Sequence, residues 1–337
     1  MKITLAATLR HYDKKNFIKD LLAGIIIMAV SIPISMGYAQ IAGLPAVYGL
    51  YGSVFPILIF ALSSTSPQFI FGVDAAPAAL IGSALLSLHI ESGSEEAMAV
   101  VPVLTFFVAL WLLAFYIMKA GKLVNYISAP DMGGFITGIC TTIILMQVPK
   151  LMGGSAGTGE FFELAEHMIR TAKDINWQSV VLGLAALVLL LVCKKLIPKF
   201  PMAVLLMIAG AGMTYLLPIE DRGVQTLASV DTGLPHWAVP DFSVISIREA
   251  VTISLSVAVV IMAETLLAEN NFAQKNGYRI NDNQEILAFS MGNFLAAFTG
   301  CCQIIRCPIA PGIAAAALKI RRFFITITIT PACKTNI

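Results

Sequence analysis

Charged side chains are scarce in this chain of 337 residues, of which only 12% are Asp, Glu, Lys or Arg. A soluble globular domain carries about 25% of such residues. Histidine occurs only four times, and none of the six cysteines stands at a metal-ligand spacing from a histidine. The low charge excludes an ordinary soluble protein and implies no nucleic-acid partner, and the Cys and His positions predict neither a metal site nor a disulfide framework.

Motifs of catalysis are missing as well. The sequence contains no His-Glu-x-x-His and no pair of aspartates within an apolar run. Its first residues carry charges up to Asp20 and lack the short apolar region and cleavage site of a removable signal peptide. These absences predict a protein that is not an enzyme, that needs no cofactor, and that keeps its first apolar segment.

Long apolar runs are abundant. Hydrophobic residues make up 58% of the chain, and its mean hydropathy is +0.83. About 20 consecutive apolar residues suffice for a helix to cross a membrane. The sequence therefore predicts an all-α polytopic membrane protein. Its apolar segments lie near residues 20–38, 47–62, 73–89, 98–118, 132–149, 178–194, 201–217, 249–268 and 284–300, with a weaker one at 308–320.

Lysines and arginines fall on one side of these segments if every segment crosses the membrane. They precede the first segment, follow the fourth, separate the sixth from the seventh, and follow the eighth. Such residues favour the cytoplasmic side, so residues 1–19 are a predicted cytoplasmic N-terminus of a multi-pass inner or plasma membrane protein. The stretch 91–96 and the loops 150–177 and 218–248 are expected outside, and the loop 218–248 is expected to be a solvated connector.

The third segment does not have the pattern of a simple spanning helix. Residues 63–73 are rich in β-branched, aromatic and turn residues, which predicts a short strand or extended stretch. A half-helix is expected to follow, with Asp74 as its N-cap and Pro77 in its first turn. The dipole and unpaired N–H groups of such a helix start can attract an anion. The predicted substrate-binding residues here are Asp74, Ala75, Ala76, Pro77 and Ala78. The alternative interpretation is that Asp74 only caps the helix and the alanines only allow close helix packing.

Glu264 lies inside the otherwise apolar segment 249–268. An ionisable group at membrane depth indicates a functional site. A buried carboxylate takes up a proton more readily, and a neighbouring anion strengthens this tendency, so proton and substrate anion would assist each other. We therefore predict that Glu264 couples transport to H⁺ or Na⁺. The alternative is a structural hydrogen bond or a place near the cytoplasmic surface. Glu269, five residues on, is expected to be solvated.

Several motifs, in order and at matching spacing, resemble the SulP family of sulfate permeases and anion exchangers. The resemblance covers roughly residues 10–302 and continues through Glu264 into residues 272–285, which are similar to that family's cytoplasmic loop after its eighth span. The motifs are Asp20-Leu-Leu-Ala-Gly24, Ile32-Pro33-Ile-Ser-Met-Gly37-Tyr38-Ala39, Gly43-Leu-Pro45-Ala-Val-Tyr48-Gly49-Leu50-Tyr51 and Phe71-Gly72-Val-Asp74-Ala-Ala.

The resemblance implies a fold of two intertwined inverted repeats of seven segments each, shared with nucleobase permeases. Residues 20–302 would then be a transmembrane domain with about nine of fourteen segments, and half-helices three and ten would face each other across the substrate. It implies secondary active transport of a small anion, with sulfate ahead of bicarbonate or a dicarboxylate, by a protein that can form a homodimer. On this basis Ser35, Tyr38 and Gln40 of the first span join the predicted substrate-binding residues.

Residues 303–337 depart from the family pattern. The Pro-x-x-Gly-Ser-x-Ser-Arg type of segment that opens half-helix ten is not recognisable, and neither are the later spans or the cytoplasmic STAS domain. We hypothesise a truncated or frameshifted gene product whose authentic sequence stops close to Cys302, and we expect little or no transport by this exact chain. The remaining alternatives are a nucleobase permease of the same fold, which the motif at 45–51 disfavours, and a non-transporting membrane fragment.

Overall fold

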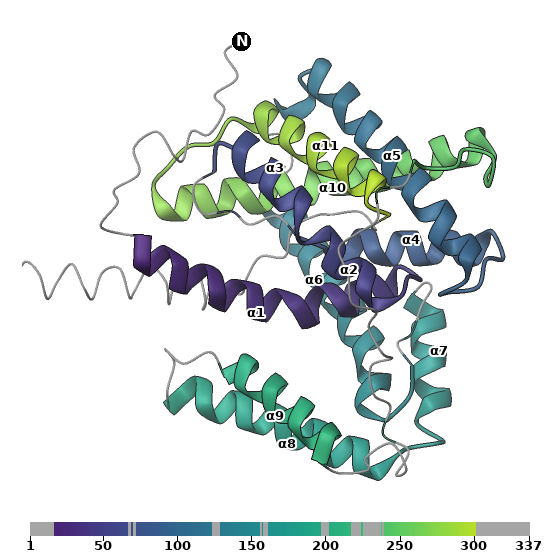
Figure 1. The fold of residues 1–337 in the computed structure, drawn as a ribbon, viewed down its shortest axis with the longest axis vertical. Coiled ribbons are helices and arrows are strands. Elements are labelled where there is room, and N and C mark those ends of the chain that lie inside the picture. Colours follow the sequence, from purple (N-terminus) through teal and green to yellow (C-terminus); the bar gives the residue numbers. More distant parts are fainter. Residues whose placement is uncertain are drawn as a thin grey trace, which may run out of the picture.

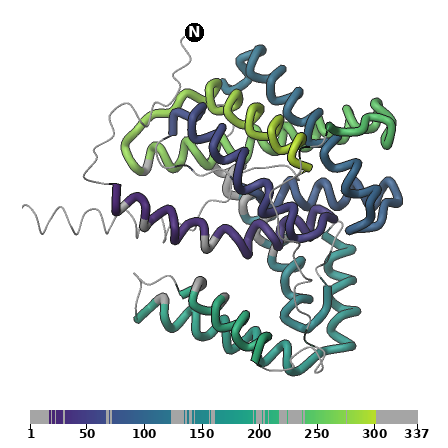
Figure 2. Tube along the Cα trace, viewed as in Figure 1, coloured from purple at the N-terminus to yellow at the C-terminus, as the bar shows by residue number. Residues whose placement is uncertain are grey.

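The computed structural model describes residues 17–66, 69, 72–122, 129–155, 157, 161–196, 202–216, 224, 237 and 239–300. Figure 2 traces them in colour, apart from some grey positions within helices. The expected cytoplasmic N-terminus up to residue 16, the atypical tail and the weak segment 308–320 lie outside these residues. The helices of the described part are α1 Phe17–Ile41, α2 Ala46–Gly52, α3 Phe55–Ser63, α4 Ala75–Ser87, α5 Glu95–Ile117, α6 Ala129–Leu151, α7 Phe161–Thr171, α8 Trp177–Leu196, α9 Met202–Leu216, α10 Ile247–Asn276 and α11 Asp282–Phe298.

Every one of the nine strong apolar segments contains a helix, which confirms the all-α prediction. The second segment holds two short helices, because the chain turns at Ser53 and Val54 between α2 and α3. By length and composition alone, the described helices include four stretches able to cross a membrane. These stretches are Ala23–Ile41, Ala46–Ser63, Glu95–Ile117 and Ile247–Gln274.

Two sequence-based boundaries were wrong. The loop predicted at about 150–177 contains α7, an amphipathic helix that is too short and too polar to register as an apolar segment. The eighth segment does not end near residue 268, since α10 continues to Asn276 and stops at Gly277, which has a left-handed φ of 75°. A polar helix end packed against protein looks like a loop in a hydropathy profile, and this explains the second error.

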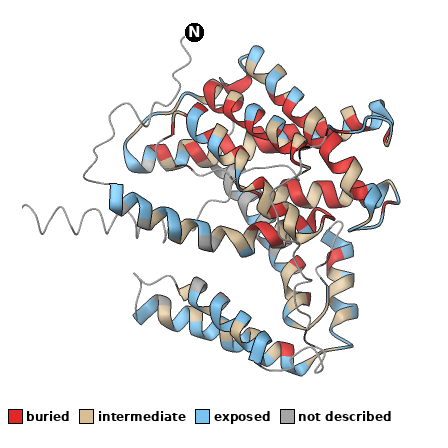
Figure 3. Cartoon of the chain, viewed as in Figure 1, coloured by how far each residue is buried: buried red, intermediate tan, exposed pale blue. Residues whose placement is uncertain are grey.

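The described helices form two groups (Figure 1). The core bundle, which we define as α1–α5 with α10 and α11, holds most of the buried residues, drawn red in Figure 3. The peripheral group, α6–α9, consists of α6 beside α7 and of the α8–α9 pair, which contacts the core bundle through α1 and α9. The candidate site lies in the core bundle, because α4 and α10 both belong to it.

Helix α5 is the central element of the core bundle and packs against both α10 and α11. Polar groups tie these helices together across the interface. The Ser290 hydroxyl of α11 donates to the Ala109 carbonyl at 2.8 Å, and the Trp111 indole N–H of α5 donates to the Val251 carbonyl at 3.1 Å. In lipid such bonds between helices add to van der Waals packing, and they hold α10 and α11 on one scaffold.

Candidate functional site

The start of α4 has the geometry that the sequence predicts. Asp74 is the N-cap with extended backbone (φ −123°, ψ 156°), and its Oδ1 accepts from the Ala75 N–H at 2.6 Å. The Ala78 N–H bonds to the Asp74 carbonyl at 3.3 Å, and Pro77 has no N–H to offer. The first N–H groups of a helix have no carbonyl acceptor within the helix. In the first turn of α4, the donor to which this applies is the Ala76 N–H.

Burial singles out the same residue. Asp74, Ala75, Pro77 and Ala78 are buried, whereas Ala76 is only half-buried. A small ligand that approached this helix start would reach Ala76 before its neighbours. Of the five residues predicted here, Ala76 is the one that combines partial exposure with a first-turn N–H that helix geometry leaves without an acceptor.

The chain leading into α4 is extended where the structure describes it. Val73 makes a single-residue bridge, and Asp74 has β-region backbone angles. The described residues contain no strand here, and these two positions are what they show of the predicted extended stretch, while residues 67, 68, 70 and 71 lie outside them. This extended entry lets α4 begin inside the core bundle and not at its edge.

Two helices with predicted site residues pack against α4, namely α1 and α10. The approach of α1 is very close, because a Cβ on Gly82 would lie 2.3 Å from the Ile41 carbonyl oxygen. Only a residue without a side chain fits there. The three elements that the sequence assigned to the site are therefore neighbours in space.

The predicted residues of α1 have different surroundings. The buried Ser35 hydroxyl is hydrogen-bonded to the Ser53 hydroxyl at 2.8 Å, beyond the end of α2. Tyr38 is half-buried and packs on the hydrophobic core, and the Gln40 side chain is exposed. The structure thus places Ser35 and Tyr38 inside the bundle and Gln40 on its outside.

Glu264 is half-buried in α10. Its Oε2 is buried and has no hydrogen-bond partner among the described residues. A buried carboxylate oxygen that lacks a donor is costly. The structural hydrogen bond considered as the alternative role of Glu264 is thus not found for this oxygen in the described part of the chain.

Glu269 was predicted to be solvated, and this was wrong. It is fully buried. The reason is the length of α10, which runs on for almost two further turns beyond Glu269 and carries it into the bundle. Two carboxylates of one helix, five residues apart, are therefore inside the protein.

Sequence reasoning missed a polar cluster at the first turn of α11. Glu285 is fully buried and accepts from the Ser64 hydroxyl and the Thr65 N–H, at 2.7 and 2.6 Å. A carboxylate inside the predicted segment 284–300 was the available signal. Its partners could not be predicted, because they lie 220 and 221 positions earlier in the chain.

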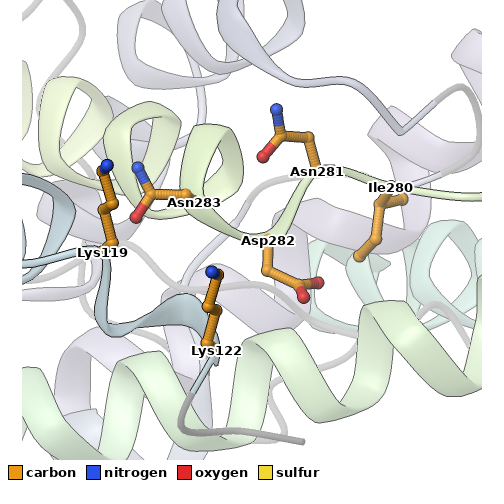
Figure 4. Close-up of a pocket in the computed structure, with 6 residues that line it drawn as sticks. All are labelled: Lys119, Lys122, Ile280, Asn281, Asp282 and Asn283. Carbon is orange, nitrogen blue, oxygen red and sulfur yellow. The ribbon is translucent and has the colours of Figure 1, made fainter. Parts of the chain in front are cut away.

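A cleft of about 470 Å³ opens on the same turn of α11 (Figure 4). It lies between the connection after α5 and the start of α11, and it shares no residue with the start of α4. In the described residues, no three His, Cys, Asp or Glu side chains are grouped as a metal site. The cleft is lined by Lys119, Lys122, Ile280, Asn281, Asp282 and Asn283.

Comparison with known proteins assigns the family. A model of the sulfate permease family matches residues 17–307, which is more than half of the chain. The chain belongs to the sulfate permease family. With its membrane-spanning helices, this member of the family is an integral membrane protein.

The relatives of this sulfate permease family member come from bacteria, plants and animals. A probable sulfate transporter of Mycobacterium tuberculosis strain H37Rv is 28% identical over 290 residues, covering 86% of the chain and 52% of the relative. Sulfate transporter 2.1 of Arabidopsis thaliana is 29% identical, with coverages of 87% and 45%, and prestin of Danio rerio is 27% identical, with 86% and 43%. The chain spans about half the length of these curated relatives.

Solved structures share the fold. The overall structure of SLC26A9 superposes with a TM-score of 0.81 at 23% identity, covering 92% of this chain and 52% of that one. The transmembrane domain of the cyanobacterial bicarbonate transporter BicA gives 0.75 at 16% identity, covering 94% and 83%. The predicted transporter fold is confirmed, and the all-helical architecture is that of these two proteins.

Proposed function

We propose that this chain provides the anion-binding half-helix of a secondary active transporter for small inorganic or carboxylate anions, with sulfate as the leading substrate. The observation that carries the proposal is the capped start of α4 inside the core bundle, where helix geometry gives the Ala76 N–H no partner within the described helix and Ala76 is half-buried. A helix N-terminus attracts an oxyanion through its N–H groups and its dipole. The names of the bacterial and plant relatives support sulfate, and bicarbonate or a dicarboxylate has the same chemistry.

Glu264 is the proposed coupling residue, for H⁺ or Na⁺. Its unpartnered buried Oε2 would gain a favourable interaction by binding a proton or a cation. An anion bound near α4 would favour the same event, since α10 packs against α4. Cation and anion would then enter together, which is symport.

The arrangement in the membrane is also proposed. The lysine and arginine distribution supports a cytoplasmic N-terminus in the inner or plasma membrane, and the family resemblance supports a homodimer. These proposals do not affect the chemistry of the α4 site.

Two measurements test the proposal. The first is titration of the purified chain with sulfate, followed by the rise in its thermal unfolding midpoint, with uracil as control ligand and Ala76→Leu as the blocking variant. The second is uptake of radiolabelled sulfate, bicarbonate and succinate into proteoliposomes across a pH gradient, beside Glu264→Gln. We expect saturable sulfate binding that Ala76→Leu removes, and any gradient-driven uptake should be lost in Glu264→Gln. Equal effects of sulfate and uracil would contradict an anion site.

A further inference from the structure

Glu285 holds two consecutive residues of the segment that follows α3. Its Oε2 accepts from the Ser64 hydroxyl at 2.7 Å, while its Oε1 accepts from the Thr65 N–H at 2.6 Å and from the Thr65 hydroxyl. Both oxygens of a fully buried carboxylate are therefore used on one short piece of chain. Two points of attachment fix the direction of that piece as well as its position.

Neighbouring groups reinforce the same attachment. They come from the turn between α10 and α11 and from the first turn of α11, and they reach Ser63, Thr65 and Ser66. The bonds are Gln284 Nε2 to the Ser63 carbonyl at 2.8 Å, Asn281 N–H to the Thr65 hydroxyl at 3.1 Å, and the Ser66 hydroxyl with the Tyr278 hydroxyl at 3.2 Å.

An aromatic contact continues the attachment one turn further along α11. The ring of Phe289 stacks on Phe60 of α3 at 5.4 Å with an interplanar angle of 9°, and Phe60 contacts Phe69 at 6.2 Å. Glu285 and Phe289 are four residues apart and thus lie on one face of α11. This face of α11 therefore contacts both α3, at Phe60, and the segment after α3, at Ser64 and Thr65, which leads towards Asp74.

We propose that Glu285 is a positioning residue for the anion site, acting through Ser64 and Thr65 to fix where α4 begins between α1 and α10. This inference rests on the proposed function of α4. A carboxylate is suited to the task because bonds to an ionised acceptor are stronger than neutral ones. Without it, three donors in the core bundle would lose their acceptor, and the entry to α4 would lose its anchor.

The test compares Glu285→Ala and Glu285→Gln with Glu249→Gln, a control at an exposed glutamate of α10. Sulfate affinity is measured by isothermal titration calorimetry on the purified full chain, and the thermal midpoint is measured separately. We expect roughly tenfold weaker binding in Glu285→Ala, which corresponds to about 1.4 kcal/mol. Glu285→Gln should recover part of it, since its amide oxygen can still accept from Thr65, and the control should match the wild type. A folded Glu285→Ala with a lower midpoint but unchanged sulfate affinity would show a merely structural role and overturn the inference.

Hydrogen exchange separates this inference from the proposed function. In Glu285→Ala we expect faster amide exchange over residues 64–66 and 72–79 than in the wild type or in Glu249→Gln. If the wild type binds no sulfate, the proposed function fails, and unchanged exchange at 72–79 would overturn the positioning role by itself. If Glu285→Ala does not fold, Thr65→Ala replaces it in both measurements, with the same expected direction.

Discussion

In α5 of the core bundle, Val100, Leu104 and Val108 are fully buried, whereas Val181 and Leu191 of α8 in the peripheral group are 63% and 59% exposed. Buried polar side chains follow the same division. Among the described residues, all of them except Ser179 lie in the core bundle or its connections. Lipid solvates an apolar side chain as well as a protein core does. The comparison teaches that polar bonds and close packing hold the core bundle together, while many apolar side chains of α8 and α9 stay exposed.

Gly82→Leu should have the largest effect of the changes that probe this difference. Its Cβ would lie 2.3 Å from the Ile41 backbone oxygen, which no change of rotamer relieves. Overpacking that neighbouring side chains can absorb costs about 1–3 kcal/mol. Here the backbone of α1 itself is in the way, so α4 could not pack on α1, and we expect most of the monodisperse protein to be lost in size-exclusion chromatography. Gly210→Leu in α9 is the control, because nothing lies within 4 Å of a Cβ there. Equal yields from the two variants would remove the distinction between the regions.

Phe289→Ala should come next, with a cost of about 3–5 kcal/mol. The side chain is fully buried and stacks on Phe60, so its removal leaves a cavity. Leu191→Ala in α8 is the matched change on an exposed apolar side chain and should have little effect on the protein. Thermal unfolding midpoints in the same detergent measure both. A larger loss for Leu191→Ala would mean that the α8 face packs on protein.

Where pH-gradient-driven anion uptake is measurable, Glu264→Gln should reduce it at least tenfold, or about 1.4 kcal/mol, because the amide cannot take up the coupling proton. Glu249→Gln changes an exposed carboxylate of the same helix and should leave uptake unchanged. Initial rates in proteoliposomes provide the measurement. If both variants lost uptake equally, the special role of a carboxylate inside the core bundle would be wrong.

Glu166→Gln should have the smallest effect, below about 0.5 kcal/mol. Its partner Arg170 lies 2.6 Å away, one turn along α7, and both side chains are mostly exposed, at 62% and 75%. The thermal midpoint should therefore shift by no more than its experimental error, and less at high salt. A clear shift would show that this peripheral helix is held by its charges.

Local features were predictable from the sequence. The start of α4 could be placed at Asp74 because a cap and the proline that follows it act within one helical turn. The nine apolar segments were found because a run of about twenty apolar residues is typical of a membrane-spanning helix. Helix α7 was missed for the same reason, as its apolar residues alternate with charged ones.

Features that depend on distant parts of the chain were not predictable. The burial of Glu269 depends on neighbours of α10, and the bond between Glu285 and Ser64 joins residues 221 positions apart in the chain. The pairing of Ser35 with Ser53 needs the turn after α2 to return to α1. A hydropathy profile contains none of this information. It averages the polarity of neighbouring residues along the sequence and says nothing about which distant residue packs against them.

Helix α10 has 30 residues and is therefore about 45 Å long, whereas the hydrocarbon layer is about 30 Å thick. Tilt alone would have to reach about 48° to hide it, beyond the roughly 40° seen for membrane helices. Its polar C-terminal turns thus project past the hydrocarbon. A rod of this length amplifies motion, since a change in tilt of about 5° moves its far end by about 4 Å. The end that carries the turn at Gly277 would therefore report, outside the membrane, on small changes in the tilt of the helix that carries Glu264.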